Sequence, residues 1–327
     1  DLNGATVRDL RLEGVSALGG NYTAALAGHA TSSTIQNILV TGDVRGADYT
    51  GGVVGYMSGG NAAQLSMAGT VRGGDRTGGI AGQCNLVTSV RHLSARGTIE
   101  GGSYVGGLAG YFTGNSVTTV DIADSFSHAA VYGVSDIGGA LGYGSYCRGL
   151  RCFSTGCVMG TGSNVGGFLG RVGSSGFDAS DCYWDTETSG QAASARGTGL
   201  TTAQMLQRSS FAGYNFFTLW QIDEGADYPV FQNLSAHAPP AALTTDDLAG
   251  DGLEVSPYLI GNADELNVMR QARSAHYRLT NDIDLAASVT WNVGQGWEPV
   301  GASSSSSFSG TLDGAGFVIR NLTVNRP

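Results

Sequence analysis

The cysteines have the most reactive side chains in this chain. They are five in number: Cys84, Cys147, Cys152, Cys157 and Cys182. No two of them form a Cys-x-x-Cys pair, the spacing typical of a structural zinc site, so we expect no zinc site. An odd number of thiols leaves at least one without a disulfide partner inside the chain.

Histidines could act as metal ligands or as general acids and bases. They are scattered and form no His-Glu-x-x-His motif: His29, His92, His128, His237 and His276. That absence excludes the metal site of the common zinc proteases. We interpret each histidine as a surface or turn residue rather than as a ligand.

Acidic residues gather in four short clusters. These are Asp181/Asp185/Glu187, Asp223/Glu224/Asp227, Asp246/Asp247/Asp251 and Asp282/Asp284. A pair of carboxylates at a set separation could cleave a glycosidic bond, and a cluster could bind calcium. None matches the twelve-residue calcium loop. We interpret them mainly as solvated turn residues and expect no catalytic residue, no metal ligand and no cofactor, with calcium binding as the minor alternative.

Several aromatic residues lie near a recurring glycine motif. They are Tyr56, Tyr104, Tyr111, Phe112, Tyr143 and Tyr146. Outward-facing aromatic rings in register could bind a sugar or a protein. The same rings could instead stack on one another and stabilise a corner of the fold. We favour the stack.

The glycine motif is Gly-Gly-x-x-Gly with two apolar residues in the middle. It begins at Gly51, Gly78, Gly106, Gly138 and Gly166, and a weaker copy covers Ala24–Gly28. Its spacing fits neither the phosphate-binding loop nor the dinucleotide fingerprint, so a structural role is favoured. The structural repeat glycines are therefore Gly51, Gly52, Gly55, Gly78, Gly79, Gly82, Gly106, Gly107, Gly110, Gly138, Gly139, Gly142, Gly166, Gly167 and Gly170.

Three short β-like stretches recur with each motif, about every 27 residues. This pattern predicts an all-β fold, a parallel β-solenoid whose coils lie about 4.8 Å apart. Glycine suits its corners, because a corner needs either a positive φ or a close backbone approach. The apolar patches align His92-Leu93 with Ser125-Phe126, and Cys152-Phe153 with Cys182-Tyr183.

This alignment places Cys152 and Cys182 at equivalent positions of successive coils. A separation of about 4.8 Å between their Cα atoms lies within the range of a disulfide. The alternative is a row of buried free thiols that act as small apolar side chains. We favour free thiols and keep the Cys152–Cys182 disulfide as the second interpretation.

Composition excludes several classes of protein. Glycine accounts for 53 of 327 residues, about twice its usual share. The net charge is −10, and all 17 basic residues are arginine, so a nucleic-acid partner is not expected. No apolar run of about 18 residues is present, so membrane insertion is not expected either.

The repeats resemble GLUG-motif repeats. The resemblance depends on the glycine motifs followed by patches such as Arg151–Gly156 and Asp181–Asp185, and it covers residues 20–236. Such repeats occur in large bacterial surface and secreted proteins, including filamentous-haemagglutinin-like adhesins. The resemblance implies a right-handed solenoid and an extracellular or cell-surface location. The segments Gly252–Ile260 and Phe308–Gly316 are similar to the opening coils of this family.

Three segments follow along the chain. Residues 1–236 form the solenoid, whose C-terminal cap includes Trp184, a short helix near Thr201–Gln207 and the stretch Trp220–Val230. Residues 237–246 form a linker rich in alanine and proline. Residues 247–327 form opening coils of a following module, with a helix over Ala263–Arg273 capped by Asn262.

The opening-like coils come last in the chain, and the coils that would continue them come first. This order predicts either one period of a tandem array or head-to-tail assembly of separate chains. Both alternatives make the protein its own partner.

The expected function is a structural or adhesive segment of a secreted or cell-surface bacterial protein, a repeating unit of a fibre or stalk. Host or matrix glycans or proteins are further expected partners. The alternative is a carbohydrate-binding or polysaccharide-degrading β-helix protein. An enzyme of that type should carry several Asp, Glu, Arg or His residues at one offset in neighbouring coils. Most of these positions hold Gly, Ser, Thr or Ala, so we expect no enzymatic activity.

Overall fold

A computed structural model describes the chain except for residues 233–243, 287–296, 298–299, 301–307 and 323–327. The chain divides into two compact units, Asp1–Ala236 and His237–Pro327, which are described separately. Most of the expected linker, residues 237–243, and parts of the segment 247–327 lie outside the described residues.

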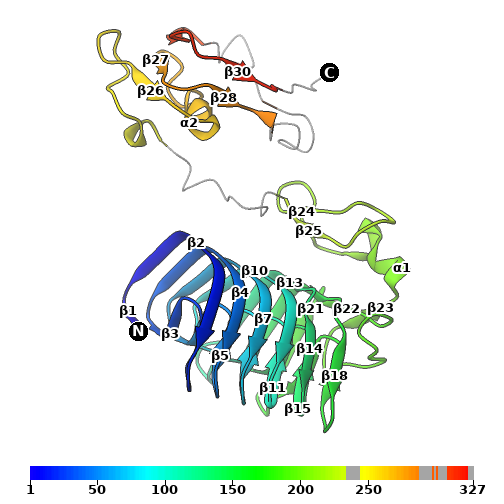
Figure 1. Ribbon diagram of the computed structural model, residues 1–327. Helices are drawn as coiled ribbons and strands as arrows, with labels where there is room; N and C mark the ends of the chain where they lie inside the picture. The colour runs from blue at the N-terminus through cyan, green and yellow to red at the C-terminus, as the bar shows by residue number, and fades with distance from the viewer. Residues whose placement is uncertain (233–243, 287–296, 298–299, 301–307, 323–327) are drawn as a thin grey trace. The chain divides into compact units, whose positions relative to one another are not determined.

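The first unit is a stack of parallel coils, and the predicted all-β solenoid is confirmed (Figure 1). It has about seven turns of about 28 residues each. Each turn contributes strands to three sheets, and every pairing within these sheets is parallel.

The first sheet has seven strands, one from each turn: β1 (Leu2–Asn3), β3 (Ala27–Thr31), β6 (Val54–Ser58), β9 (Ala81–Asn85), β12 (Ala109–Thr113), β16 (Leu141–Ser145) and β20 (Leu169–Val172). The smallest sheet has five short strands, which contain the first glycine of each motif: β5 (Thr50–Gly51), β8 (Thr77–Gly78), β11 (Ser103–Gly106), β15 (Ser135–Gly138) and β19 (Val165–Gly166).

The largest sheet has eleven strands. Its main path is β2 (Thr6–Leu18), β4 (Thr34–Arg45), β7 (Asn61–Arg72), β10 (Ser89–Glu100), β13 (Val120–Ser127), β17 (Cys147–Ser154), β22 (Tyr183–Asp185) and β23 (Thr198–Leu200). Beside this path lie β14 (Ala130–Gly133), β18 (Val158–Gly160) and β21 (Phe177–Ser180).

Inward side chains of successive coils stack into rows and fill the interior. Ile38, Leu65 and Leu93 occupy one row, and each is almost completely buried. The next member of this row is Ser125, because Ser94 lies opposite Phe126. The expected alignment of Leu93 with Phe126 is therefore wrong by one residue.

The shift has a physical reason. A side chain one position along a strand points to the opposite face, so Phe126 points outward while Ser125 takes the interior position. The hydroxyl of Ser125 is satisfied there: it donates to the carbonyl of Ala123 at 2.8 Å and accepts from the N–H of Leu93 at 3.0 Å. A small, fully hydrogen-bonded residue is tolerated in the core.

The outward aromatic rings are covered by the C-terminal part of the first unit. This lateral cap contains α1 (Thr202–Met205), a 3₁₀ turn over Arg208–Ser210 and an antiparallel hairpin of β24 (Trp220–Gln221) and β25 (Val230–Phe231). Thr201 caps the N-terminus of this helix, because its side chain accepts from the N–H of Gln204. Figure 1 shows the segment, in yellow-green, leaving the stack after β23.

Trp220 joins the lateral cap to the side of the sheet. Its ring centroid lies 5.9 Å from that of Phe126 and 5.7 Å from that of Phe153, on neighbouring coils. Trp184, in contrast, points inward and belongs to the solenoid core. The single predicted cap is thus two structures: Trp184 fills the interior of the last turns, and the Trp220 segment covers the outer face.

The second unit also pairs its strands in parallel. β26 (Tyr258–Ile260), β27 (His276–Leu279) and β29 (Thr311–Asp313) form one sheet, and β28 (Ile283–Asp284) and β30 (Ile319–Arg320) form another. The helix α2 (Ala263–Val268) begins at Asn262, whose side chain accepts from the N–H of Glu265 at 2.9 Å. It ends earlier than the predicted Arg273. A 3₁₀ turn covers Thr245–Asp247.

No helix in the described part of the chain is long and apolar enough to cross a membrane.

Candidate functional site

One corner of the solenoid carries two neighbouring rows of side chains, most of which are tyrosine or arginine. In the seven-stranded sheet, one outward residue per coil lies directly after the closing glycine of each motif. These residues come from β3, β6, β9, β12, β16 and β20. These residues are in register: His29, Tyr56, Gln83, Tyr111, Tyr143 and Arg171. We call this row together with its neighbour, described next, the tyrosine corner.

The neighbouring row lies where the chain turns into the short strands. Its members have left-handed backbone conformations with φ between 57° and 59°: Tyr22, Tyr49, Arg76, Tyr104, Asp136 and Asn164. Non-glycine residues rarely adopt this conformation. The stacking of one coil on the next therefore has to stabilise it, and each coil repeats it at the same place.

The third glycine of each motif makes room for this corner. A Cβ atom on Gly82 would come within 2.6 Å of the carbonyl carbon of Tyr49 and 2.7 Å of the carbonyl oxygen of Arg76. Gly110 and Gly142 face the backbone of Tyr104 in the same way. Close approach, rather than positive φ, is thus what these glycines provide, and the left-handed residues are not glycines.

The first glycines of the motifs stack directly on one another. Gly51 lies opposite Gly78, Gly78 opposite Gly106, and the series continues through Gly138 to Gly166. A Cβ atom on the second glycine of a motif would meet the backbone of the next coil, as Gly79 and Gly107 illustrate. The glycine motif is therefore a close-packed edge of the coil.

The rings of the tyrosine corner pack against one another. Tyr22 and Tyr49 stack with centroids 4.6 Å apart, and Tyr111 and Tyr143 stack with centroids 4.3 Å apart. Tyr104 meets Tyr111 edge to face at 5.5 Å. Such stacked and edge-to-face arrangements are the favourable ones for aromatic pairs.

Arg76 lies in the coil between that of Tyr49 and that of Tyr104 and Tyr111, and it contacts all three rings. Its guanidinium lies 4.8 Å from the ring centroid of Tyr49, 5.6 Å from that of Tyr104 and 5.3 Å from that of Tyr111. A cation over aromatic faces is stabilised by the ring quadrupoles. Arg171 repeats the arrangement over Tyr143 at 5.8 Å and also pairs with Asp136 at 3.4 Å.

The faces of these rings are therefore largely occupied by neighbouring rings and guanidinium groups. Partial burial, helped by the neighbouring Tyr143, raises the pKa of Tyr111 to about 12. The hydroxyl stays protonated at neutral pH, so it is not a general base. Of the other aromatics considered from the sequence, Phe112 is buried inside the solenoid and Tyr146 belongs to a different left-handed corner.

The cysteines do not form a reactive centre. All five are free thiols, and all except Cys157 are buried. Cys152 and Cys182 lie on neighbouring coils, one residue before the paired Phe153 and Tyr183. Burial raises the pKa of Cys152, and a hydrogen bond with Cys182 raises it further. Both thiols are free in this structure.

A shallow pocket of about 420 Å³ is lined by Thr119, Tyr146, Cys147, Arg148, Ser175, Gly176 and Asp178. Among these residues, Cys147 has the side chain that could act as a nucleophile. Its thiol donates to the carbonyls of Ser145 at 2.8 Å and Phe112 at 3.1 Å, and burial raises its pKa to about 12. Since the thiolate is the reactive form, this thiol is unreactive at neutral pH.

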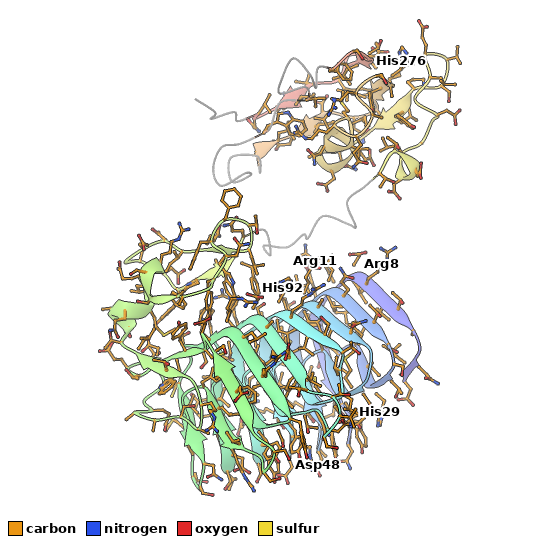
Figure 2. All side chains as sticks on the ribbon, turned by 180° about the vertical axis from the view of Figure 1, so that it is seen from behind. Arg8, Arg11, His29, Asp48, His92 and His276 are labelled. Atoms are coloured by element: carbon orange, nitrogen blue, oxygen red, sulfur yellow. The ribbon has the colours of Figure 1, made fainter. Side chains whose placement is uncertain are left out.

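Two histidines lie against the lateral cap. Burial lowers the pKa of His128 to about 3, and its Nδ1 lies 2.6 Å from the hydroxyl of Thr155. Burial also lowers the pKa of His92, whose ring lies 5.9 Å from that of Phe231. His29 lies in the tyrosine corner, and Figure 2 shows it well separated from His92. His237 lies outside the described residues.

The acidic clusters do not converge on a metal site. No group of three or more His, Cys, Asp and Glu side chains that could hold a metal ion occurs among the described residues. Asp185, in the first cluster, is fully buried and structural: it accepts from the hydroxyl of Tyr228 at 2.7 Å and from the N–H groups of Glu187 and Thr188.

The geometry defines a β-solenoid repeat protein whose side chains form stacked rows. No family model matches the chain, and no solved structure matches it. It is similar to halomucin of Haloquadratum walsbyi, with 38% identity over 86 residues, which are 25% of this chain and 1% of that protein. It is also similar to a protein of Evansella cellulosilytica described as a Gly-rich membrane protein. That match has 31% identity over 147 residues, 42% of this chain and 17% of that protein. The matched region is thus a small part of both relatives.

Proposed function

We propose that this chain is a structural, adhesive segment of a secreted or cell-surface protein, built from GLUG-type repeats and extended as a fibre or stalk. The observation that carries the proposal is the repetition itself. The residues at equivalent positions of successive coils make contacts with one another, as the tyrosine corner does, and these contacts stabilise the coil stack. A rigid rod is what a solenoid of stacked coils forms.

The similar proteins support the location. One relative is named halomucin, and the other is described as a Gly-rich membrane protein. Names of this kind fit a surface-associated protein.

A catalytic role is not proposed. The buried thiols and the buried His128 have pKa values shifted away from those that nucleophilic or acid–base catalysis requires. In the first acidic cluster, the carboxylate of Asp185 accepts from the hydroxyl of Tyr228, and that of Glu187 accepts from the N–H of Thr202. We also propose that no cofactor is needed.

Glycan binding at the tyrosine corner is the second candidate. It is favoured by the regular spacing of the rings along the solenoid and opposed by their mutual stacking, since sugars bind open aromatic faces. A glycan array with the wild-type chain and the Tyr111→Ala variant separates the alternatives. Binding that the variant loses would favour a glycan-binding function over a purely structural one.

The surface location is tested on cells of the source organism. We expect an antibody against the chain to label intact cells or secreted fibres, and protease added outside the cells to remove the signal. A cytosolic enzyme serves as the control that protease must not reach. Labelling that appears only after the cells are lysed would contradict the proposal.

A further inference from the structure

The first coil of the solenoid has a strand edge without a partner among the described residues. β1 pairs only with β3, and the long strand β2 pairs only with β4. Val7, Leu10 and Leu12 of β2 point inward but are only partly buried. Their counterparts one coil later, Ile35, Ile38 and Val40, are at most 1% exposed. The first coil therefore presents unfinished interior rows.

The second unit has a complementary edge at its last described coil. β29 pairs only with β27, and β30 pairs only with β28, within the part of the chain that is described. Leu312 is 39% exposed, whereas Tyr277 in the coil behind it is 1% exposed. Phe317, Val318 and Leu322 in the same coil are 41%, 44% and 50% exposed. This edge is therefore where a following coil would stack on the second unit.

The two edges have the same local backbone. Residues 7–10 read Val-Arg-Asp-Leu, and residues 319–322 read Ile-Arg-Asn-Leu. Asp9 has a φ of 57° and Asn321 a φ of 56°, so both stretches turn at a left-handed residue in the same position. A coil of one type can therefore stack on a coil of the other in register.

At this turn, asparagine amides donate to carboxylates of the coil before them. The amide of Asn37 donates to the carboxylate of Asp9 in the coil before it, at 2.7 Å. The amide of Asn321 donates to the carboxylate of Asp284 in the coil before it, at 2.8 Å, although Asp284 lies opposite Arg320, one position before Asn321. An asparagine amide has two N–H donors, so Asn321 has one left for a carboxylate on its other side.

We infer that the first coil of a second copy of this chain stacks on the β29–β30 edge, with its Asp9 beside Asn321. The contact continues the amide–carboxylate hydrogen bonds from Asp284 and Asn321 to Asp9 and Asn37. It is a head-to-tail contact between different surfaces, so it can repeat from copy to copy and extend into a filament. This joint rests on the proposed fibre function and specifies how one copy joins the next.

The joint also brings Arg8 and Arg320 together. Arg320 already pairs with Asp282 at 2.7 Å, and Arg8 lies 3.8 Å from Asp9. The chain stacks two arginines elsewhere, because Arg45 lies directly opposite Arg72 in neighbouring coils. Stacked arginines with nearby carboxylates are therefore compatible with this fold.

The first test measures association of the full chain by sedimentation velocity over a range of concentrations. Asn321→Asp places two carboxylates face to face across the joint and should weaken association about tenfold or more. Asp9→Asn added to that variant restores one amide–carboxylate pair and should recover most of the loss. Asn281→Asp, the same change in charge within the second unit, is the control. Wild-type chain that stays monomeric at every concentration would overturn the inference.

The second test traps the contact. A mixture of Asp9→Cys chains and Asn321→Cys chains should form a disulfide-linked heterodimer under mild oxidation, since four of the native thiols are buried. Neither variant alone should do so beyond the wild-type level. Equal cross-linking when Asn281→Cys replaces Asn321→Cys would contradict the joint.

The two proposals can fail separately. Surface labelling together with unaffected association in the Asn321 and Asp9 variants would leave the structural function in place and remove this joint. Specific cross-linking of a chain that is never found outside the cell would support this joint and contradict the proposed surface function.

Discussion

Single residues stabilise this molecule mainly through what lies directly above and below them. The left-handed turn in the largest sheet recurs in seven successive coils, at Asp9, Asn37, Gln64, His92, Asp124, Arg151 and Asp181. Oppositely charged or amide-bearing side chains pair along this row, as Arg151 and Asp124 do through two hydrogen bonds of 2.7 Å. The local cost of a left-handed residue is thus offset by contacts between coils.

Among single residues, His128 should make the free energy of unfolding depend on pH. Its pKa is about 3 in the folded chain and about 6.5 when exposed, so the folded state binds fewer protons than the unfolded state. The full contribution of His128 is present above pH 6.5 and is lost as the pH falls towards 3. The loss steepens below pH 6.5 and approaches about 1.4 kcal/mol per pH unit near pH 5.

The groups around His128 allow a clean control. Its ring contacts Phe126 and Tyr228, its Nδ1 faces Thr155, and the positive charge of Arg96 lowers its pKa further. Urea unfolding at pH 6.5 and pH 5 should show a steeper loss for wild type than for His128→Gln. Equal losses in the two proteins would contradict the assignment.

The buried thiols give a second prediction for single residues. Burial raises the pKa values of Cys84 and Cys147 to about 12, so both stay protonated at neutral pH. We expect only the partly exposed Cys157 to react with an alkylating reagent in the native chain. In denaturant without reductant all five thiols should react. Labelling of only three would instead reveal the Cys152–Cys182 disulfide.

At the scale of elements, the close-packed glycine edge determines how coils meet. Gly82→Ala pushes a Cβ atom against the backbone of Tyr49 and Arg76, so it should lower the free energy of unfolding by about 2 kcal/mol or more. Gly20→Ala is the matched control, because a Cβ atom there has nothing within 4 Å. Thermal unfolding of both variants measures the difference, and equal midpoints would refute the packing explanation.

The tyrosine corner supports a prediction about Arg76. Replacing it with methionine keeps an unbranched apolar stem but removes the cation from Tyr49, Tyr104 and Tyr111. We expect a loss of about 1–2 kcal/mol in the free energy of unfolding. Arg91→Met, at an exposed position of β10, should cost far less. A comparable loss in both variants would mean that the contact with the rings is not the cause.

Much of this architecture could be predicted from the spacing of the glycine motifs. Their period predicts stacked coils, and the structure pairs the first glycine of each motif with the next. The shift at Ser125 and Phe126 could not be predicted, because it depends on a lateral cap more than 70 residues further along the chain. The left-handed residues were also missed, since Tyr49 and Arg76 are not residue types that signal such a backbone.

For the whole molecule, both units present strand edges of parallel coils. Such edges bind further strands unless something covers them. The lateral cap covers the outer face of β13, β17 and β22, where its aromatic rings pack. It leaves the edges of β2 and β29 without a strand partner among the described residues. Growth along the solenoid axis is therefore the form of assembly that this fold favours.

Cryo-electron microscopy of the purified native material tests that claim most directly. We predict filaments in which coils spaced by about 4.8 Å continue from one unit into the next. The junction should show Asp9 of one copy or module beside Asn321 of the other. Separate particles at high concentration, or filaments whose coil stack is interrupted at every junction, would contradict the account.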